Sequence, residues 1–138
     1  MKVVLALDAG VFDTDLASAR TLRAVTRQAL LRGGEVWVCA VTLAEACRGT
    51  ARTRQVESLL ARHRDDARVR VRETDERFAK RVGQILYEAN RGSEAMADAH
   101  VVALCADAEA AVVFTTDPTD IVALSAVVPG TRIITRRP

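Results

Sequence analysis

Short apolar runs alternate along the chain with longer stretches in which apolar residues recur every three or four positions. A short apolar run bounded by turn residues predicts a buried strand, whereas the longer spacing predicts a helix with one buried face. Val69 and Val71 alternate with arginines, which is typical of a half-exposed strand. The predicted strands are residues 2–7, 36–39, 69–71, 111–114 and 132–135.

The helical stretches have recognisable starts and stops. Asp75 is positioned to cap a long helix that Gly92 ends, and Gly33 and Gly34 end an earlier one. The predicted helices are residues 21–31, 42 to about 49, 52–64, 75 to about 91, 95–106 and 118–127. Apolar strands that alternate with helices favour an α/β fold with a mostly parallel sheet covered by helices on both faces.

Composition limits the architecture and the location of the protein. A chain of 138 residues with 49% hydrophobic residues suits one domain, residues 1–138, with a proper core. No apolar run reaches the roughly 18 residues of a membrane span, and the apolar N-terminus meets Asp8 too early for a signal peptide. We therefore expect no membrane association and a cytoplasmic location. The three cysteines lack a CxxC spacing, which favours reduced thiols over a disulfide framework or a zinc site.

The basic residues are almost all arginine. Lys2 and Lys80 are the only lysines among 20 basic residues, and many arginines lie between Arg48 and Arg72. Arginine suits phosphate binding, but solvated helix faces would give the same pattern. The net charge of +2 does not decide between these interpretations, and only 4% aromatic residues argue against a base-stacking platform.

Two aspartates follow predicted strands directly. Asp8 comes after residues 2–7, and Asp117 comes just after residues 111–114. Parallel sheets bind ligands beyond the carboxyl ends of their strands, so both carboxylates are expected at that edge. Local alternatives remain open, because Asp8 can be a turn residue before Gly10, and Asp117 with Pro118 is a good helix opening.

Two further acids come from predicted helices. Glu45 lies in the first turn after the strand 36–39, although Thr42 and Glu45 also have the spacing of a capping box. Asp98 shares a helix face with Val101 and Val102, and no basic residue on its helix is placed to pair with it. A buried unpaired carboxylate is costly, so a cation shared with other acids would explain Asp98.

Together these acids predict a metal site. Oxygen-only ligands favour hard cations such as Mg²⁺ or Mn²⁺, and such ions polarise a phosphoryl group and lower the pKa of a bound water. Glu94 and Asp120 lie one turn from Asp98 and Asp117, where they can either assist or be solvated.

Four segments in order and spacing resemble the PIN domain, and in particular the VapC-like toxins of bacterial toxin–antitoxin pairs. The segments are residues 7–11 (LDAGV), 41–49 (VTLAEACRG), 98–104 (DAHVVAL) and 113–121 (VFTTDPTDI). The resemblance implies that Asp8, Glu45, Asp98 and Asp117 are the catalytic, metal-binding acids, with Mg²⁺ or Mn²⁺ as cofactor. Thr115 or Thr116 would position water or ligand. Many PIN domains carry Ser or Asn two residues after the first acid, where this chain has Gly10.

The resemblance also implies a function. It implies an endoribonuclease with RNA as substrate, a cognate antitoxin as partner, and a homodimer. Within the same family, the alternative is a housekeeping PIN nuclease.

Functions of two other classes fit these residues less well. A magnesium-dependent haloacid-dehalogenase-type phosphohydrolase would require a second aspartate where Gly10 stands. A third alternative is a non-catalytic binding module, which the intact set of acids disfavours. Neither His63 nor His100 has the context of a nuclease base, and His100 is interpreted as structural because it lies about 200° around its helix from Asp98.

Overall fold

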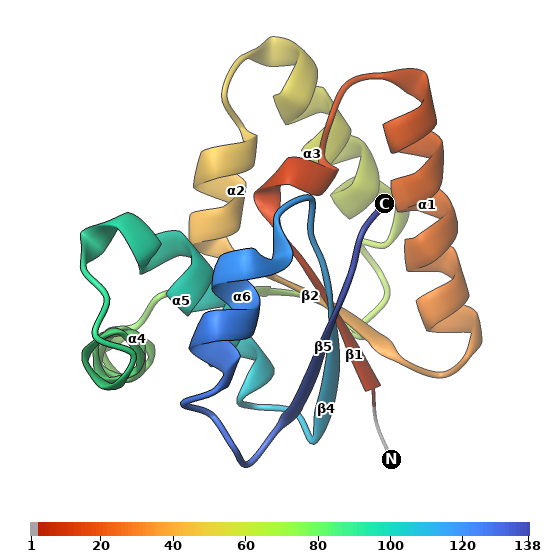
Figure 1. Ribbon diagram of the computed structural model, residues 1–138. Helices are drawn as coiled ribbons and strands as arrows, with labels where there is room; N and C mark the ends of the chain where they lie inside the picture. The colour runs from red at the N-terminus through yellow and green to blue at the C-terminus, as the bar shows by residue number, and fades with distance from the viewer. Residues whose placement is uncertain (1–2) are drawn as a thin grey trace.

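The computed structural model describes residues 3–138 (Figure 1). Its elements, in chain order, are β1 (Val3–Leu7), η1 (Ala9–Val11), α1 (Leu16–Leu31), β2 (Glu35–Cys39), α2 (Ala40–Ala46), α3 (Thr50–Arg62), β3 (Val69–Arg72), α4 (Glu76–Glu88), η2 (Ser93–Ala95), α5 (Met96–Cys105), β4 (Ala110–Phe114), α6 (Pro118–Ser125) and β5 (Arg132–Arg136). No helix within the described residues is long and apolar enough to cross a membrane.

The five strands form one sheet in the order β3-β2-β1-β4-β5, and every neighbouring pair is parallel. The predicted α/β fold class is therefore confirmed. The order of the strands reverses at β1, because β2 and β3 lie on one side of it and β4 and β5 on the other. Open parallel sheets bind ligands at such a reversal, beyond the carboxyl ends of the strands.

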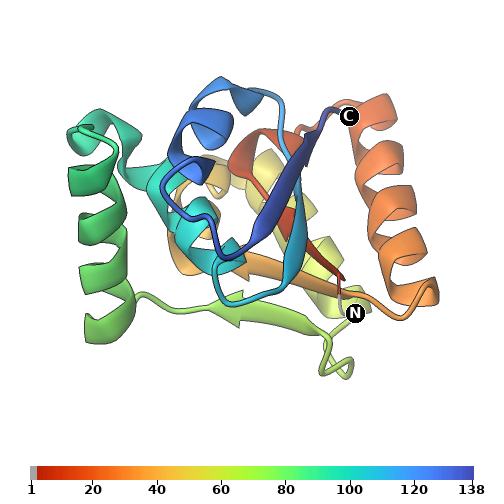
Figure 2. The same ribbon diagram turned by 60° about the horizontal axis from the view of Figure 1, so that its bottom comes forward.

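Helices cover both faces of the sheet, as Figures 1 and 2 show. One core lies between the sheet and helices α1, α2 and α3, and the other lies between the sheet and α4, α5 and α6. Seven consecutive residues of α5, from Ala99 to Cys105, are buried, so this helix is surrounded by protein. Burial from both faces explains why β1, β2 and β4 are nearly continuous apolar runs.

The predicted elements all exist, but several boundaries differ. Helix α1 begins at Leu16 instead of residue 21, because Asp15 caps it by accepting a 2.8 Å hydrogen bond from the Ser18 amide. Asp75 caps α4 as predicted, accepting from the Phe78 amide at 2.8 Å. Helix α6 ends at Ser125, two residues before the predicted end. The predicted first strand included Lys2, which lies outside the described residues.

The proposed capping box in α2 is wrong. The helix begins at Ala40, directly after β2, and Cys39 is its N-cap without a side-chain hydrogen bond. Thr42 is therefore inside the helix and buried, where its side chain cannot cap the first turn. The position of Glu45 is not explained by capping.

Candidate active site

Asp8 lies where the strand order reverses. Leu7 pairs with Phe114 across β1 and β4, so the residues that follow each strand emerge side by side. The Asp8 amide continues this ladder by donating a 3.0 Å hydrogen bond to the Phe114 carbonyl. One carboxylate oxygen, Oδ1, accepts a 2.8 Å bond from the Ala9 amide. Asp8 thus occupies a fixed position at the carboxyl edge of the sheet.

Thr115 connects Asp8 to the segment after β4. Its hydroxyl group is fully buried and donates a 2.7 Å hydrogen bond to Oδ2 of Asp8. The hydroxyl oxygen of Thr115, Oγ1, also accepts a 3.1 Å bond from the Asp117 amide. The Thr115 side chain therefore orients Asp8 and fixes the turn that carries Asp117.

Asp117 is the N-cap of α6, as the sequence predicted, and its Oδ1 accepts a 3.4 Å bond from the Thr119 amide. The Asp117 residue is exposed to solvent. One turn later, Asp120 forms a 3.1 Å ion pair with Arg91. The start of α6 therefore brings two carboxylates to this edge, and one of them already has a cationic partner.

Glu45 projects from α2 into the same region. Partial burial and the charge of Asp8 raise the pKa of its carboxyl, while Arg48 and Arg52 oppose this shift. Arg52 also donates a 2.9 Å hydrogen bond from Nη2 to the Ala9 carbonyl, beside Asp8. Its buried Nε has no hydrogen-bond partner among the described residues. Glu45 and Asp8 are close enough for each to influence the other.

The charges of all these acids act on Asp98. It is half-buried in the first turn of α5, and no ion pair with it is present within residues 3–138. Burial raises the pKa of Asp98 to about 6, and the negative charges of Asp8, Asp120, Glu45 and Asp117 contribute in the same direction. The four predicted acids, together with Asp120, thus share one electrostatic environment.

The donor set contains only carboxylate oxygens, the ligands that hard divalent cations prefer. Within the described part of the chain, no three acidic, histidine or cysteine side chains already form a metal-ligand arrangement. The acids nevertheless act on one another, because the charges of the other acids add to the effect of burial in raising the pKa of Asp98. A divalent cation would relieve that repulsion, so the residues present fit such an ion.

The other candidate residues lie around this cluster. Glu94 is exposed, and its Oε1 accepts a 3.0 Å bond from the Gly92 amide. Thr116 fills the space next to Gly10, where an added Cβ atom would lie 2.2 Å from Oγ1 of Thr116. His100 is buried against Phe78, with Nδ1 placed 2.8 Å from the Met96 carbonyl oxygen.

Sequence reasoning missed two cations near the acids. Arg52 reaches across from α3, 43 residues along the chain from Ala9, and Arg91 reaches across to Asp120, 29 residues away. No local pattern identifies either contact, because each depends on how separate helices pack around the edge of the sheet.

Comparisons with known proteins agree with the fold. The profile of the PIN domain family matches residues 5–122. The crystal structure of VapBC2 from Rickettsia felis bound to a DNA fragment from their promoter contains a chain that superposes with a TM-score of 0.54 at 10% sequence identity, covering 96% of this chain and 98% of that one. No curated protein matches the sequence significantly. At that level of identity, the structural neighbour supports the fold alone.

Proposed function

Because the chain belongs to the PIN domain family, we propose that it is a metal-dependent endoribonuclease that hydrolyses RNA phosphodiester bonds. The observation that carries this proposal is the position of Asp98. It is a half-buried carboxylate without an ion-pair partner in the described residues, surrounded by the charges of four other acids. If Asp98 served only the fold, a basic side chain should pair with it. If Asp98 binds a metal ion, other acids should lie around it, as they do here.

The proposed ligands of Mg²⁺ or Mn²⁺ are Asp8, Glu45, Asp98 and Asp117. When bound, such an ion would stabilise charge on the phosphoryl group and lower the pKa of a water molecule. The chain itself supplies positioning. Thr115 holds the Asp8 carboxylate, and Arg52 holds the Ala9 carbonyl and offsets negative charge near Glu45.

The resemblance of the four sequence segments to VapC-like toxins supports a role as such a toxin with a cognate antitoxin. The neighbour is a VapBC2 assembly on promoter DNA, so we propose an antitoxin partner for this chain as well, together with the expected homodimer and cytoplasmic location. A housekeeping nuclease is the alternative within the same family. Induced expression separates them, because a toxin should arrest growth and co-expression of an antitoxin encoded beside its gene should relieve the arrest, whereas a housekeeping nuclease should show neither effect.

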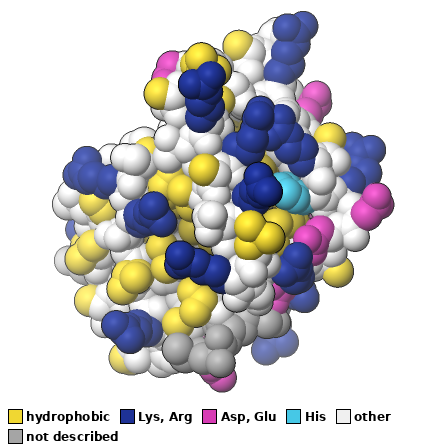
Figure 3. Space-filling model, turned by 90° about the vertical axis from the view of Figure 1, so that its right-hand side faces the viewer, with side chains coloured by type: hydrophobic (Ala, Val, Ile, Leu, Met, Phe, Trp, Pro, Cys, Tyr) yellow, Lys and Arg dark blue, Asp and Glu magenta, His cyan; other side chains and the backbone are white. Residues whose placement is uncertain are grey.

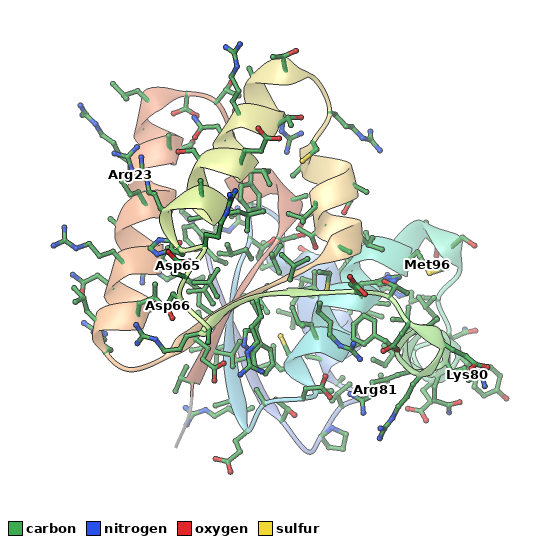
Figure 4. The ribbon with its side chains drawn as sticks, turned by 180° about the vertical axis from the view of Figure 1, so that it is seen from behind. Arg23, Asp65, Asp66, Lys80, Arg81 and Met96 are labelled. Atoms are coloured by element: carbon green, nitrogen blue, oxygen red, sulfur yellow. The ribbon has the colours of Figure 1, made fainter. Side chains whose placement is uncertain are left out.

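The biochemical test is cleavage of RNA by the purified protein with Mg²⁺, Mn²⁺ or EDTA. We expect cleavage with either metal, none with EDTA, and a loss of several orders of magnitude in Asp98→Asn. Asp65→Asn is the matched control, because Asp65 is exposed in the turn after α3, where Figure 4 labels it, and it is not among the charges that act on Asp98. Equal activity of the two variants would contradict the assignment.

Assays on the same purified protein also test the two alternative functions. Hydrolysis of p-nitrophenyl phosphate without cleavage of RNA would favour a phosphohydrolase. Metal binding without either reaction would favour a non-catalytic binding module.

A further inference from the structure

Helix α1 presents a row of arginines without acidic residues. Arg20, Arg23 and Arg27 are separated by three and four positions, so they lie along one side of the helix, and all three are exposed. The helix contains no aspartate or glutamate between Leu16 and Leu31. The exposed side of α1 is therefore uniformly positive.

Helix α3 extends this charge. Arg62 is exposed and lines a shallow depression between the two helices together with Arg23. The other polar residues of that depression, Gln55 and Ser58, are uncharged hydrogen-bonding groups. We call the surface formed by Arg20, Arg23, Arg27 and Arg62 the arginine face. Figure 3 shows this side of the molecule, where Lys and Arg side chains outnumber acidic ones.

The arginines of this face lack the acidic partners that several basic residues elsewhere have. Within residues 3–138, none of the four forms an ion pair. Around β3 and α4, by contrast, several basic side chains pair with acids. These pairs are Arg70 with Glu35, Arg72 with Asp75, Lys80 with Glu76, Arg81 with Asp107, and Arg91 with Asp120.

The clustering of exposed arginines without acidic partners on one face favours an external partner. Unpaired like charges on one face repel each other and create a positive potential that attracts a polyanion. Guanidinium groups also match phosphate geometry. Asp65 and Asp66 lie in the turn beyond Arg62, and Asp66 is already paired with Arg68 at 2.9 Å.

The arginine face leads away from the acid cluster. Helix α1 begins eight residues after Asp8, and α3 begins five residues after Glu45, so both helices start near the edge that carries the acids. Figure 1 shows α1 and α3 descending side by side from that edge. A nucleic acid strand whose backbone lay at the acids could continue over both helices.

We propose that the arginine face binds backbone phosphates of RNA on one side of the cleavage site. This inference rests on the proposed ribonuclease function and adds a binding surface to it. Phosphate contacts give affinity without base specificity and make binding depend on salt. The surface would therefore favour long RNA over short oligonucleotides without selecting a sequence.

The test compares two double variants that change charge equally. Arg23→Gln with Arg27→Gln alters the arginine face, and Arg77→Gln with Lys80→Gln alters exposed positions on α4. Glutamine has nearly the helix propensity of arginine and lysine, so both variants should fold. Figure 4 shows Arg23 and Lys80 at opposite ends of the molecule.

Binding is measured with a labelled 20-nucleotide single-stranded RNA, in an Asp98→Asn background to prevent cleavage. The α1 variant should bind about tenfold more weakly at ~0.1 M salt, and the salt slope should fall by roughly 0.7 per lost phosphate contact. The α4 variant should bind as the parent does. Equal affinity of both double variants, or unchanged RNA binding with weakened binding of poly-glutamate, would overturn the inference.

Cleavage kinetics separate this inference from the proposed function. With otherwise native protein, the α1 variant should lose activity on long RNA while keeping it on a trinucleotide too short to reach the face. Cleavage of both substrates at the native rate would overturn the arginine face alone. Failure of the native protein to cleave any RNA would overturn the ribonuclease function, and the binding measurement would still decide the role of the arginine face.

Discussion

The Thr115 hydroxyl donates a 2.7 Å hydrogen bond to Oδ2 of Asp8, across 107 residues of sequence. The two residues follow adjacent parallel strands, and Leu7 and Phe114, which precede them, are paired in register. Thr115 is completely buried, so the bond is shielded from water. The orientation of the Asp8 carboxylate therefore depends on β1 and β4 being neighbours in the sheet.

Replacing Thr115 with valine should weaken this arrangement while keeping its shape. The Asp8 oxygen and the Asp117 amide would each lose a partner, so we expect the free energy of unfolding to fall by about 1–3 kcal/mol. RNA cleavage per folded molecule should fall as well, because the carboxylate is no longer oriented. Urea denaturation and initial cleavage rates on the same preparation measure the two effects.

Two comparisons make the Thr115 prediction specific. Thr115→Ser keeps the hydroxyl and should retain most of the activity. Thr131→Val removes a 3.0 Å hydrogen bond to the Ala108 carbonyl, away from the acids, and should cost stability without changing cleavage per folded molecule. Native cleavage by Thr115→Val would show that the contact has only a structural role.

Gly10 and Thr116 should depend on each other. A Cβ atom at position 10 would lie 2.2 Å from Oγ1 of Thr116, which is far inside van der Waals contact. Gly10→Ala should therefore force Thr116 to move and cost about 1–3 kcal/mol, as other overpacked sites do. Thr116→Ala removes the obstructing oxygen, and the double variant should recover part of the loss.

A double-mutant cycle of urea denaturation curves checks this coupling. The interaction energy between the two positions should be on the order of 1 kcal/mol in favour of the double variant. Strict additivity would mean that Thr116 rotates away freely. In that case the close approach of Gly10 and Thr116 would not explain the glycine at position 10.

The sequence predicted the strands, the caps at Asp75 and Asp117, and the edge to which the acids belong. These features follow from local chemistry, since a buried parallel strand must be apolar and a helix start needs an acceptor for its free amides. The prediction failed at α2 because Thr42 and Glu45 have the spacing of a capping box, although the chain enters that helix directly from β2. Spacing alone does not reveal where a strand ends.

Contacts between distant segments could not be predicted. The bonds from Thr115 to Asp8 and from Arg52 to Ala9 depend on which strands are neighbours and how helices pack over them. The arginine face is also a property of two helices together. From the sequence, its residues were equally compatible with ordinary solvated surfaces.

Divalent metal should stabilise the folded protein. A cation that binds the acid cluster in the native state but not in the unfolded chain stabilises by mass action, by about 2.7 kcal/mol at 100 times its Kd. We expect millimolar Mn²⁺ to raise the melting temperature relative to EDTA. The rise should be smaller in Asp8→Asn and unchanged in Asp65→Asn. Identical melting curves with EDTA, Mn²⁺ and Ca²⁺ would contradict metal binding at the cluster.

Asp98→Asn should separate catalysis from folding. Burial and four neighbouring acids raise the pKa of Asp98 from 3.8 to about 6, so the native state holds this proton more tightly than the unfolded chain does. In EDTA, this group therefore lowers the stability of the native protein as pH rises from about 4 to 6, and the full penalty is present above pH 6. Asparagine has no charge to desolvate, so the metal-free variant should be more stable than the native protein at pH 7.5, by on the order of 1–3 kcal/mol. That difference should disappear below about pH 4, where both side chains are neutral.

The opposite outcome has a distinct signature. If a buried arginine held Asp98, the asparagine variant would strand that charge and lose about 3–5 kcal/mol. Urea denaturation in EDTA at pH 4 and pH 7.5, with RNA cleavage measured at pH 7.5, distinguishes the two cases. A catalytic Asp98 predicts greater metal-free stability with cleavage reduced by orders of magnitude, because the fold tolerates the loss of charge while the metal site does not. Lower stability at pH 7.5 with native cleavage per folded molecule would remove Asp98 from the catalytic set.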